Sequence, residues 1–213
     1  MDDLRISCDF YIKSSYLSNK RCKKVRINRL IQTIMLAIKR GSIERGKYLK
    51  EKNIFAFVGE NVHFQPRLVP LYPQLIKLHN NIMVSAGVRL ITHDASFVIL
   101  NRLGIGRFPE KVGCIEIMNN VYVGYNATIM PNVKIGENVI VGAGALVAKD
   151  LEPNGVHVGV PVRRICSFDD YVERNSPDWG GTTTRLFCII NIYLRKRLKM
   201  RGKYLTVALS RVY

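Results

Sequence analysis

Residues 115–150 read IEIMNNVYVGYNATIMPNVKIGENVIVGAGALVAKD, and an aliphatic side chain returns in this stretch at every sixth position. The series consists of Ile117, Val123, Ile129, Ile135, Val141 and Val147. A second apolar series runs two residues earlier, through Ile115, Val121, Ala127, Val133, Val139 and Ala145. An α-helix repeats about every 3.6 residues and a strand about every two. A period of six therefore predicts short strands that turn corners, as in a solenoid.

The corners of this repeat have residue types of their own. Asparagine or glycine stands three residues after each of the first five aliphatic positions, at Asn120, Asn126, Asn132, Asn138 and Gly144. These residues tolerate a positive φ at the least cost, so a tight turn fits between strands. Three strands would close one coil of about 18 residues, and stacked coils would bury a continuous core. We therefore predict an all-β core built as a parallel β-helix rather than a chance alternation in a β-sandwich.

Residues 121–165 carry a family resemblance. Their sequence, VYVGYNATIMPNVKIGENVIVGAGALVAKDLEPNGVHVGVPVRRI, resembles the end of a hexapeptide-repeat acyltransferase, similar to sugar and polysaccharide O-acetyltransferases and to galactoside and maltose acetyltransferases. The resemblance implies a left-handed β-helix, a homotrimer, and transfer of an acetyl group from acetyl-coenzyme A to a sugar hydroxyl. Left-handedness is an implication of the resemblance only, because crossover connections are generally right-handed.

The repeat divides the chain into three predicted parts. Residues 1–57 form a basic helical segment, 58–165 the β-helix domain, and 166–213 a cap, a linker and a basic helical tail. Within the β-helix, Leu90 and Ile117 are 27 residues apart (117 − 90), which is not a multiple of six. An excursion loop over residues 94–114 must therefore leave the coil, and long loops in compact domains are usually functional.

Helical periodicity marks residues 24–52. Apolar residues recur on one face, at Ile27, Leu30, Ile31, Ile34, Met35 and Ile38, and Gly41 is expected to interrupt the helix. We expect this face to pack on the solenoid as a cap; a basic helix lying on a membrane surface is the alternative. The same two alternatives apply to the basic tail from Arg185 to Tyr213.

The excursion loop begins at Thr92-His93-Asp94, and GVRLITHD is similar to the family's catalytic turn. The resemblance implies that His93 is the general base. Neutral imidazole is also the side chain best matched to take the proton of an acceptor hydroxyl. Asp94 is a candidate to orient the imidazole, although neighbouring residues on a strand point to opposite faces.

The resemblance also implies contacts to coenzyme A. The VGAG turn would place the backbone of Ala143 near the pantetheine, and Lys149 and Arg163 would meet the phosphates. Ala148 stands where relatives often carry a hydroxyl residue. Tyr122 would flank the pantetheine arm or simply pack, and Tyr125 aligns with a backbone contact in relatives. For Lys149 and Arg163, a solvated surface charge is the competing interpretation.

Composition bounds the remaining partners. The 213 residues carry a formal net charge of +17, which predicts attraction to coenzyme A or to an anionic membrane. No nucleic-acid-binding signature accompanies the charge. No metal is expected, since His63, His79 and His157 have no zinc-ligand spacing with His93. A zinc enzyme of the carbonic-anhydrase type and a noncatalytic scaffold are the alternative functions. Residues 1–25 lack the apolar core of a signal peptide, so we expect a cytoplasmic enzyme, with peripheral contact at the inner membrane face as a variant.

Overall fold

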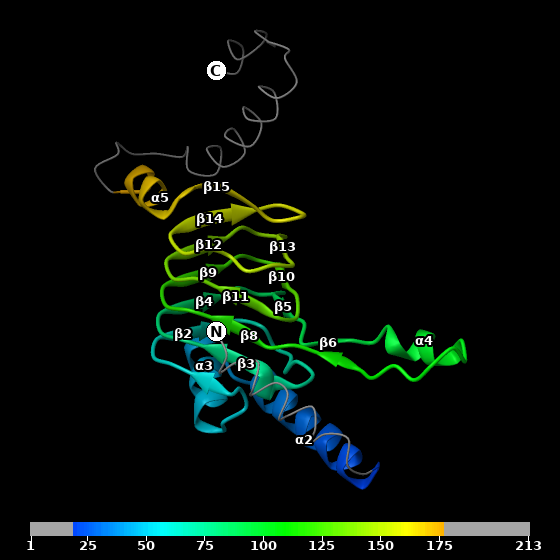
Figure 1. The fold of residues 1–213 in the computed structure, drawn as a ribbon. Helices are drawn as coiled ribbons and strands as arrows, with labels where there is room; N and C mark the ends of the chain where they lie inside the picture. Colours follow the sequence, from blue (N-terminus) through cyan, green and yellow to red (C-terminus); the bar gives the residue numbers. More distant parts are fainter. Residues whose placement is uncertain (1–18, 177–213) are drawn as a thin grey trace, which may run out of the picture. The chain divides into compact units, whose positions relative to one another are not determined.

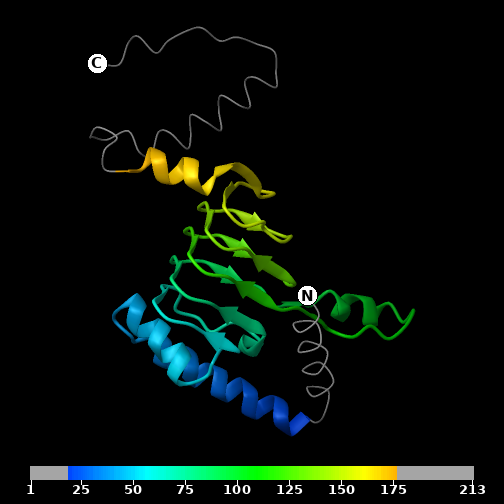
Figure 2. The ribbon, with the colours of Figure 1, turned by 60° about the vertical axis from the view of Figure 1, so that its left-hand side comes forward.

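The computed structural model describes residues 19–176, with side chains from residue 27 onward. Most of these residues form a stack of triangular coils with three faces of short strands, seen from two sides in Figures 1 and 2. The first face contains β1 (Phe57–Val58), β3 (Ile76–Leu78), β8 (Ile115–Ile117) and β11 (Val133–Ile135). The second contains β2 (Val62–Phe64), β4 (Ile82–Val84), β9 (Val121–Val123), β12 (Val139–Val141), β14 (Gly155–Val158) and β15 (Arg163–Ser167). The third contains β5 (Arg89–Leu90), β10 (Thr128–Ile129) and β13 (Leu146–Val147).

All neighbouring strands of the three faces pair in parallel except β14 and β15. The predicted hexapeptide series fills the core of the stack. The aliphatic positions from Ile117 to Val147 are fully buried, and the series from Ile115 to Ala145 is at most 2% exposed. The predicted left-handed parallel β-helix is confirmed.

The corners also match the prediction. Asn120, Asn126, Asn132, Asn138 and Gly144 all have positive φ, between 53° and 67°. At the corner between the first and second faces the asparagine side chains form a ladder. Asn81 Nδ2 donates to Asn120 Oδ1 over 2.8 Å, and Asn120 Nδ2 donates to Asn138 Oδ1 over 2.9 Å. Each corner amide is thereby paired with the coil above and the coil below.

The N-terminal segment forms two helices, α2 (Asn19–Ala37) and α3 (Ser42–Glu51), separated at Gly41 as expected. Helix α3 packs on the first coils, where Gly46 approaches the backbone so closely that an added Cβ would lie 2.0 Å from the Val62 carbonyl oxygen. The buried guanidinium of Arg45 donates to the Phe64 and Lys39 carbonyls over 2.8 and 2.7 Å. Helix α3 therefore covers the N-terminal end of the β-helix.

The apolar face of α2 does not pack on the solenoid. Among the apolar residues of α2 whose side chains are described, Leu36 is fully buried. The predicted face is exposed: Ile27 58%, Leu30 60%, Ile31 54%, Ile34 53%, Met35 39% and Ile38 63%. The expected packing of residues 24–52 on the solenoid is therefore met by α3 and Leu36, while the predicted apolar face of α2 is left exposed.

The excursion loop is an arm that leaves the stack sideways (Figures 1 and 2). Its stem is an antiparallel pair, β6 (His93–Asp94) and β7 (Lys111–Val112), and its outer part contains α4 (Phe97–Arg102). A 3-10 turn, η1 (Pro73–Leu75), precedes β3 and ends a proline-rich interruption of the coils that contains Pro66, Pro70 and Pro73. The prediction of an excursion between Leu90 and Ile117 is confirmed.

A second unit begins at Asp169 and contains most of α5 (Phe168–Arg174). Asp169 and Asp170 lie in its first turn and Arg174 in its last, which suits the helix dipole. The basic tail from Arg185 lies outside the described residues. In the part that is described, no helix combines the length and the apolar character needed to cross a bilayer.

Candidate active site

His93 is placed at the base of the arm by two sets of backbone contacts. His93 pairs with Val112 across the stem of the arm. The preceding carbonyl, of Thr92, accepts a 2.9 Å hydrogen bond from the Gly113 N–H. Thr92 itself is 1% exposed and its hydroxyl donates to the Leu71 carbonyl. The imidazole therefore projects from a point where the chain is fixed on both sides.

The environment of the imidazole is partly enclosed. Its Nδ1 is buried and has no hydrogen-bond partner among the described residues. The ring of Tyr72 meets it edge-on, with ring centroids 6.1 Å apart. Buried polar atoms are normally paired, so an unpaired ring nitrogen at the base of a loop suits a functional role.

The carboxylate of Asp94 forms its hydrogen bonds within the arm and not with the imidazole of His93. Its carboxylate oxygens accept hydrogen bonds from the N–H and the hydroxyl of Ser96, over 2.8 and 3.0 Å, just before α4. These two bonds, with smaller effects of Lys111 and His93, lower the pKa of the Asp94 carboxyl. As the alternation along a strand predicts, Asp94 makes no hydrogen bond to His93.

A groove of about 820 Å³ lies beside His93. Its walls come from α2, from the segment after β2, and from the segment of β5 that leads to His93. Arginines enter it from each of these three elements: Arg29, Arg67 and Arg89. Most of the other lining side chains are aliphatic, among them Leu30, Leu71 and Ile91.

The register of the third face relates His93 to Lys149. Leu90, Ile129 and Val147 occupy equivalent positions in three successive coils. His93 follows Leu90 by three residues and Lys149 follows Val147 by two, so both lie along the same corner edge. Two coil steps separate them, roughly 10 Å at the usual spacing of paired strands. Ala148 precedes Lys149 on this edge, and both are exposed.

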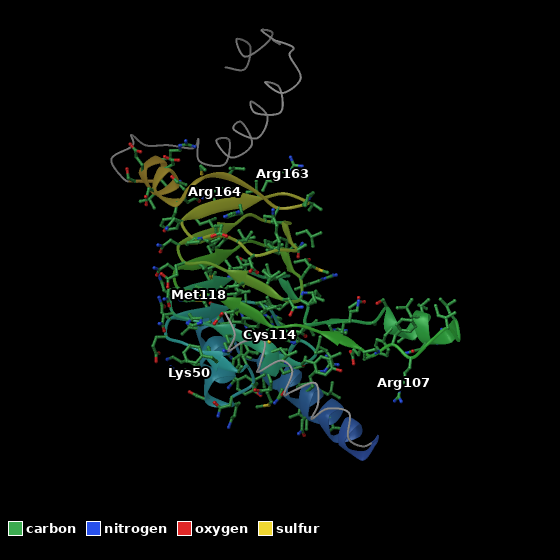
Figure 3. The ribbon with its side chains drawn as sticks, in the orientation of Figure 1. Lys50, Arg107, Cys114, Met118, Arg163 and Arg164 are labelled. Carbon is green, nitrogen blue, oxygen red and sulfur yellow. The ribbon has the colours of Figure 1, made fainter. Side chains whose placement is uncertain are left out.

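Two other predicted residues lie on the opposite edge of the third face. The Gly144 N–H donates to the Tyr125 carbonyl over 2.8 Å, which stacks Ala143 above Tyr125 at one corner. Both are exposed. Arg163 comes directly after Val162, whose N–H donates to the Leu146 carbonyl of β13, so it lies over the last coil. Figure 3 shows Arg163 at the end of the stack remote from α2.

Tyr122 lies away from the third face, on the same sheet whose last strand begins at Arg163. It lies on the second face, between Met83 and Ile140 in register, and is 42% exposed. Within one chain it is thus separated from the edge that holds His93 and Lys149. The other predicted site residues all border the third face or the arm.

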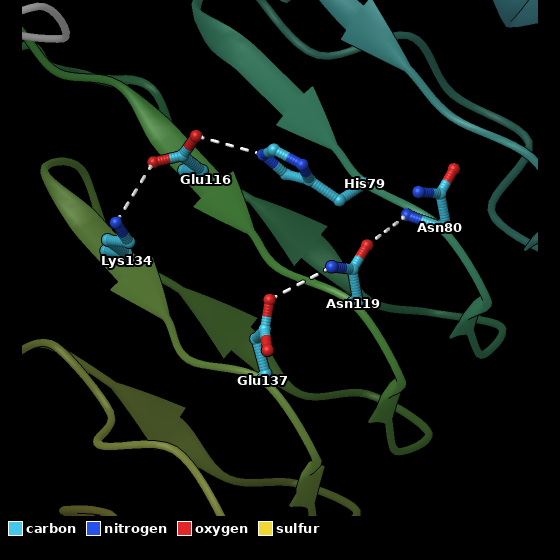
Figure 4. A network of polar contacts seen from close by, with 6 residues as sticks. All are labelled: His79, Asn80, Glu116, Asn119, Lys134 and Glu137. Carbon is cyan, nitrogen blue, oxygen red and sulfur yellow. Dashed lines mark hydrogen bonds and ion pairs between the residues drawn. The ribbon is translucent and has the colours of Figure 1, made fainter.

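The remaining histidines have structural surroundings. His79 Nε2 lies 3.0 Å from Glu116 Oε1, in the polar network drawn in Figure 4, which Lys134 joins 3.7 Å from Glu116 Oε2. His63 Nδ1 lies 3.3 Å from the Ser42 hydroxyl. His157 is buried in β14, and its Nε2 is likewise buried without a hydrogen-bond partner among the described residues, but it lies away from the arm. Among residues whose side chains are described, no three His, Cys, Asp or Glu side chains converge as a metal site would require.

Several residues of the site could not be predicted from the sequence. Tyr72 and the arginines Arg29, Arg67 and Arg89 come from segments without a readable motif. Arg67 and Tyr72 lie in the proline-rich interruption, and Arg29 lies in α2. Only the tertiary fold brings them to His93. The alternation along β5 was the one signal available, since it predicts that Arg89 points outward.

Comparison with known proteins agrees with the fold. The family model "Bacterial transferase hexapeptide (six repeats)" matches residues 115–149. Protein CapG of Staphylococcus aureus is 39% identical over 129 residues, which cover 60% of this chain and 73% of CapG. A suspected acetyltransferase of Schizosaccharomyces pombe is 36% identical over 115 residues, or 50% of this chain. The chain spans only 53% of the length of that yeast relative.

A solved structure extends the comparison beyond the repeat. A galactoside acetyltransferase in complex with coenzyme A superposes with a TM-score of 0.55 at 25% identity, covering 76% of this chain and 90% of that one. The repeat, the corner asparagines and the long match to CapG all indicate the same family. The chain belongs to the hexapeptide-repeat acetyltransferase family and is related to galactoside acetyltransferase.

Proposed function

We propose that this protein transfers an acetyl group from acetyl-coenzyme A to a sugar hydroxyl, with His93 as the general base. The observation that carries the proposal is the position of His93, at the base of the arm and beside a groove, on the same edge as Lys149. The similar galactoside acetyltransferase was solved with coenzyme A, which supports the choice of donor.

The reaction follows from the chemistry of a thioester and a hydroxyl. The imidazole takes the hydroxyl proton, and the oxygen attacks the thioester carbonyl carbon. Because Nδ1 is enclosed, Nε2 is the nitrogen that would accept this proton. A backbone N–H would stabilise the oxyanion. The carbon–sulfur bond then breaks, and the imidazolium returns the proton to the departing thiolate, so no covalent enzyme intermediate is required.

The coenzyme would lie along the third face, on the coils that follow His93. Ala143 and Tyr125 border this face on one edge and Ala148 and Lys149 on the other, while Arg163 lies over the last coil. Exposed small residues at the edges permit close approach of the pantetheine, and the two cations suit phosphates. Tyr122 faces another direction, so its contact would require a neighbouring subunit. We therefore propose that the protein is a homotrimer. We also propose that it is located in the cytoplasm.

Titration of the full chain with coenzyme A tests the donor site without knowledge of the acceptor. We expect saturable binding, weakened about tenfold by Lys149→Ala or Arg163→Ala and unchanged by Lys47→Ala, an exposed lysine of α3. Acetyl transfer to a sugar panel tests the base. His93→Asn should lower turnover by about 100-fold or more and leave coenzyme binding intact. Full turnover in His93→Asn would contradict its role, and no binding at millimolar coenzyme A would favour the noncatalytic scaffold.

A further inference from the structure

The groove beside His93 has an unbalanced charge. Arg29, Arg67 and Arg89 line it, and its lining contains no aspartate or glutamate. In the described part of the chain, none of the three arginines forms an ion pair. Arg67 Nη1 donates to the carbonyl of Ala37 over 2.9 Å, which fixes that side chain and leaves its other donors available. Three guanidinium groups thus share one groove without an anionic partner.

The three arginines of the groove lie apart from the two cations of the proposed coenzyme site. Lys149, Ala143 and Arg163 lie on the coils after His93, toward the C-terminal end of the stack. The three arginines come from α2, from residues 66–71 and from residues 87–91, which precede His93, while Asn126 lines the groove from the next coil. A thioester held on the later coils and an acceptor held in the groove would meet at the imidazole. The arginines are therefore on the acceptor side of the base.

The side chains of the groove define the kind of acceptor that it suits. A guanidinium presents a planar fork of donors that matches phosphate and carboxylate oxygens. Burying such cations against a neutral sugar would leave their charge unmatched. The aliphatic side chains between them, such as Leu30, Leu71 and Ile91, suit the apolar face of a sugar ring or an apolar substituent.

We propose that the acceptor is an anionic sugar, carrying a phosphate or a carboxylate that Arg29, Arg67 and Arg89 bind while His93 takes the proton of a nearby hydroxyl. This inference rests on the proposed acetyltransferase function and names the substrate class of the same site. Phosphate and carboxylate share the chemistry that the arginines recognise, and the choice of probe distinguishes them.

The first experiment is a binding measurement on the protein saturated with coenzyme A. The probes are glucose, glucose 6-phosphate, glucuronate and inorganic phosphate. We expect glucose 6-phosphate or glucuronate to bind at least about tenfold more tightly than glucose, with the tighter of the two identifying the anionic group. Arg89→Gln and Arg67→Gln should each weaken that binding about tenfold and leave coenzyme A affinity unchanged, whereas Lys47→Gln should alter neither.

The second experiment compares acetyl transfer to the neutral and anionic sugars. The anionic acceptor should have the higher kcat/KM, and Arg89→Gln should raise the KM for the anionic acceptor by a larger factor than the KM for a neutral one, whereas Lys47→Gln should change neither. Equal binding of glucose and both anionic sugars would overturn the inference, as would a loss of coenzyme A affinity in the arginine variants. Failure of the proposed function would look different, because coenzyme A itself would then not bind.

Discussion

The ring of Tyr72 stands edge-on to the imidazole of His93, at an interplanar angle of 75°. The hydroxyl of the same tyrosine donates a 2.7 Å hydrogen bond to Glu110 Oε2 on the arm. One side chain therefore links the proposed base to the arm. We expect Tyr72→Phe to lower kcat/KM for the acceptor by about tenfold, because a hydrogen bond to a carboxylate is lost while the ring remains.

Steady-state kinetics with varied acceptor and varied acetyl-coenzyme A would measure this effect. The KM for acetyl-coenzyme A should stay unchanged, since the coenzyme is proposed to lie on later coils. Glu110→Ala removes the acceptor of this hydrogen bond, and the double variant should be no worse than either single one. Additive losses would show that Tyr72 and Glu110 act independently of each other.

Asn120 combines a strained backbone with two ladder hydrogen bonds. Its φ is 57°, and its side chain bonds to Asn81 and Asn138. We expect Asn120→Ala to reduce the free energy of unfolding by about 1–3 kcal/mol, through left-handed strain and lost hydrogen bonds. Asn120→Gly relieves the strain and loses only the bonds, so it should be less damaging by about 1 kcal/mol. Denaturant unfolding would measure both; equal losses would refute a contribution from the backbone.

The solenoid was predictable from sequence because its determinants are local. Each coil needs an inward aliphatic residue and a residue that accepts positive φ. Residues such as Ile129 and Asn132 meet these two requirements and are recognisable in the sequence. Register then follows from the period, which placed Lys149 on its edge and the arm between Leu90 and Ile117. The general location of His93 could be predicted for the same reason.

The rest of the site depends on contacts between segments that have no shared period. Arg29 reaches the groove because α2 crosses the early coils, and no pattern within α2 specifies that direction. The exposure of Ile31 and Ile34 has the same origin, since helical spacing predicts an apolar face but not its partner. The two hydrogen bonds that Asp94 accepts from Ser96 could not be predicted, because they require the turn that opens the arm.

His157 should make folding stability depend on pH. The residue is 6% exposed, and burial, followed by the nearby Arg164 cation, lowers its pKa below the ordinary value of 6.5, although a backbone hydrogen bond with Glu152 opposes this. Below pH 6.5 the unfolded chain takes up a proton that folded His157 resists, so the free energy of unfolding falls as the pH falls. Above that pH the imidazole is neutral in both states and the effect vanishes.

Thermal unfolding at several pH values would show the effect of His157 as a drop in Tm below pH 6.5. His157→Gln should flatten that part of the curve, even if it lowers stability at neutral pH. An identical slope in His157→Gln and the unmodified protein would assign the dependence to other groups.

The exposed face of α2 predicts binding to anionic membranes. Ile27, Ile31, Ile34 and Ile38 follow one another at helical spacing and are each more than half exposed. The sequence of α2 contains no aspartate or glutamate, and the chain carries a net charge of +17. Such a combination of an apolar stripe and positive charge suits a helix lying in the surface of an anionic bilayer, whereas like charges would oppose a second copy at this face.

Sedimentation with lipid vesicles tests this expectation for α2. The protein should bind vesicles that contain phosphatidylserine and not vesicles of phosphatidylcholine alone, and added salt should weaken the binding. The double variant Ile31→Ser, Ile34→Ser should reduce binding by about tenfold or more, since two apolar side chains no longer enter the bilayer. Ile99→Ser, which changes an apolar residue of α4 that is 59% exposed, should leave it unchanged. If the double variant instead lowered the oligomeric state and vesicle binding were absent, the face of α2 would be a contact between subunits.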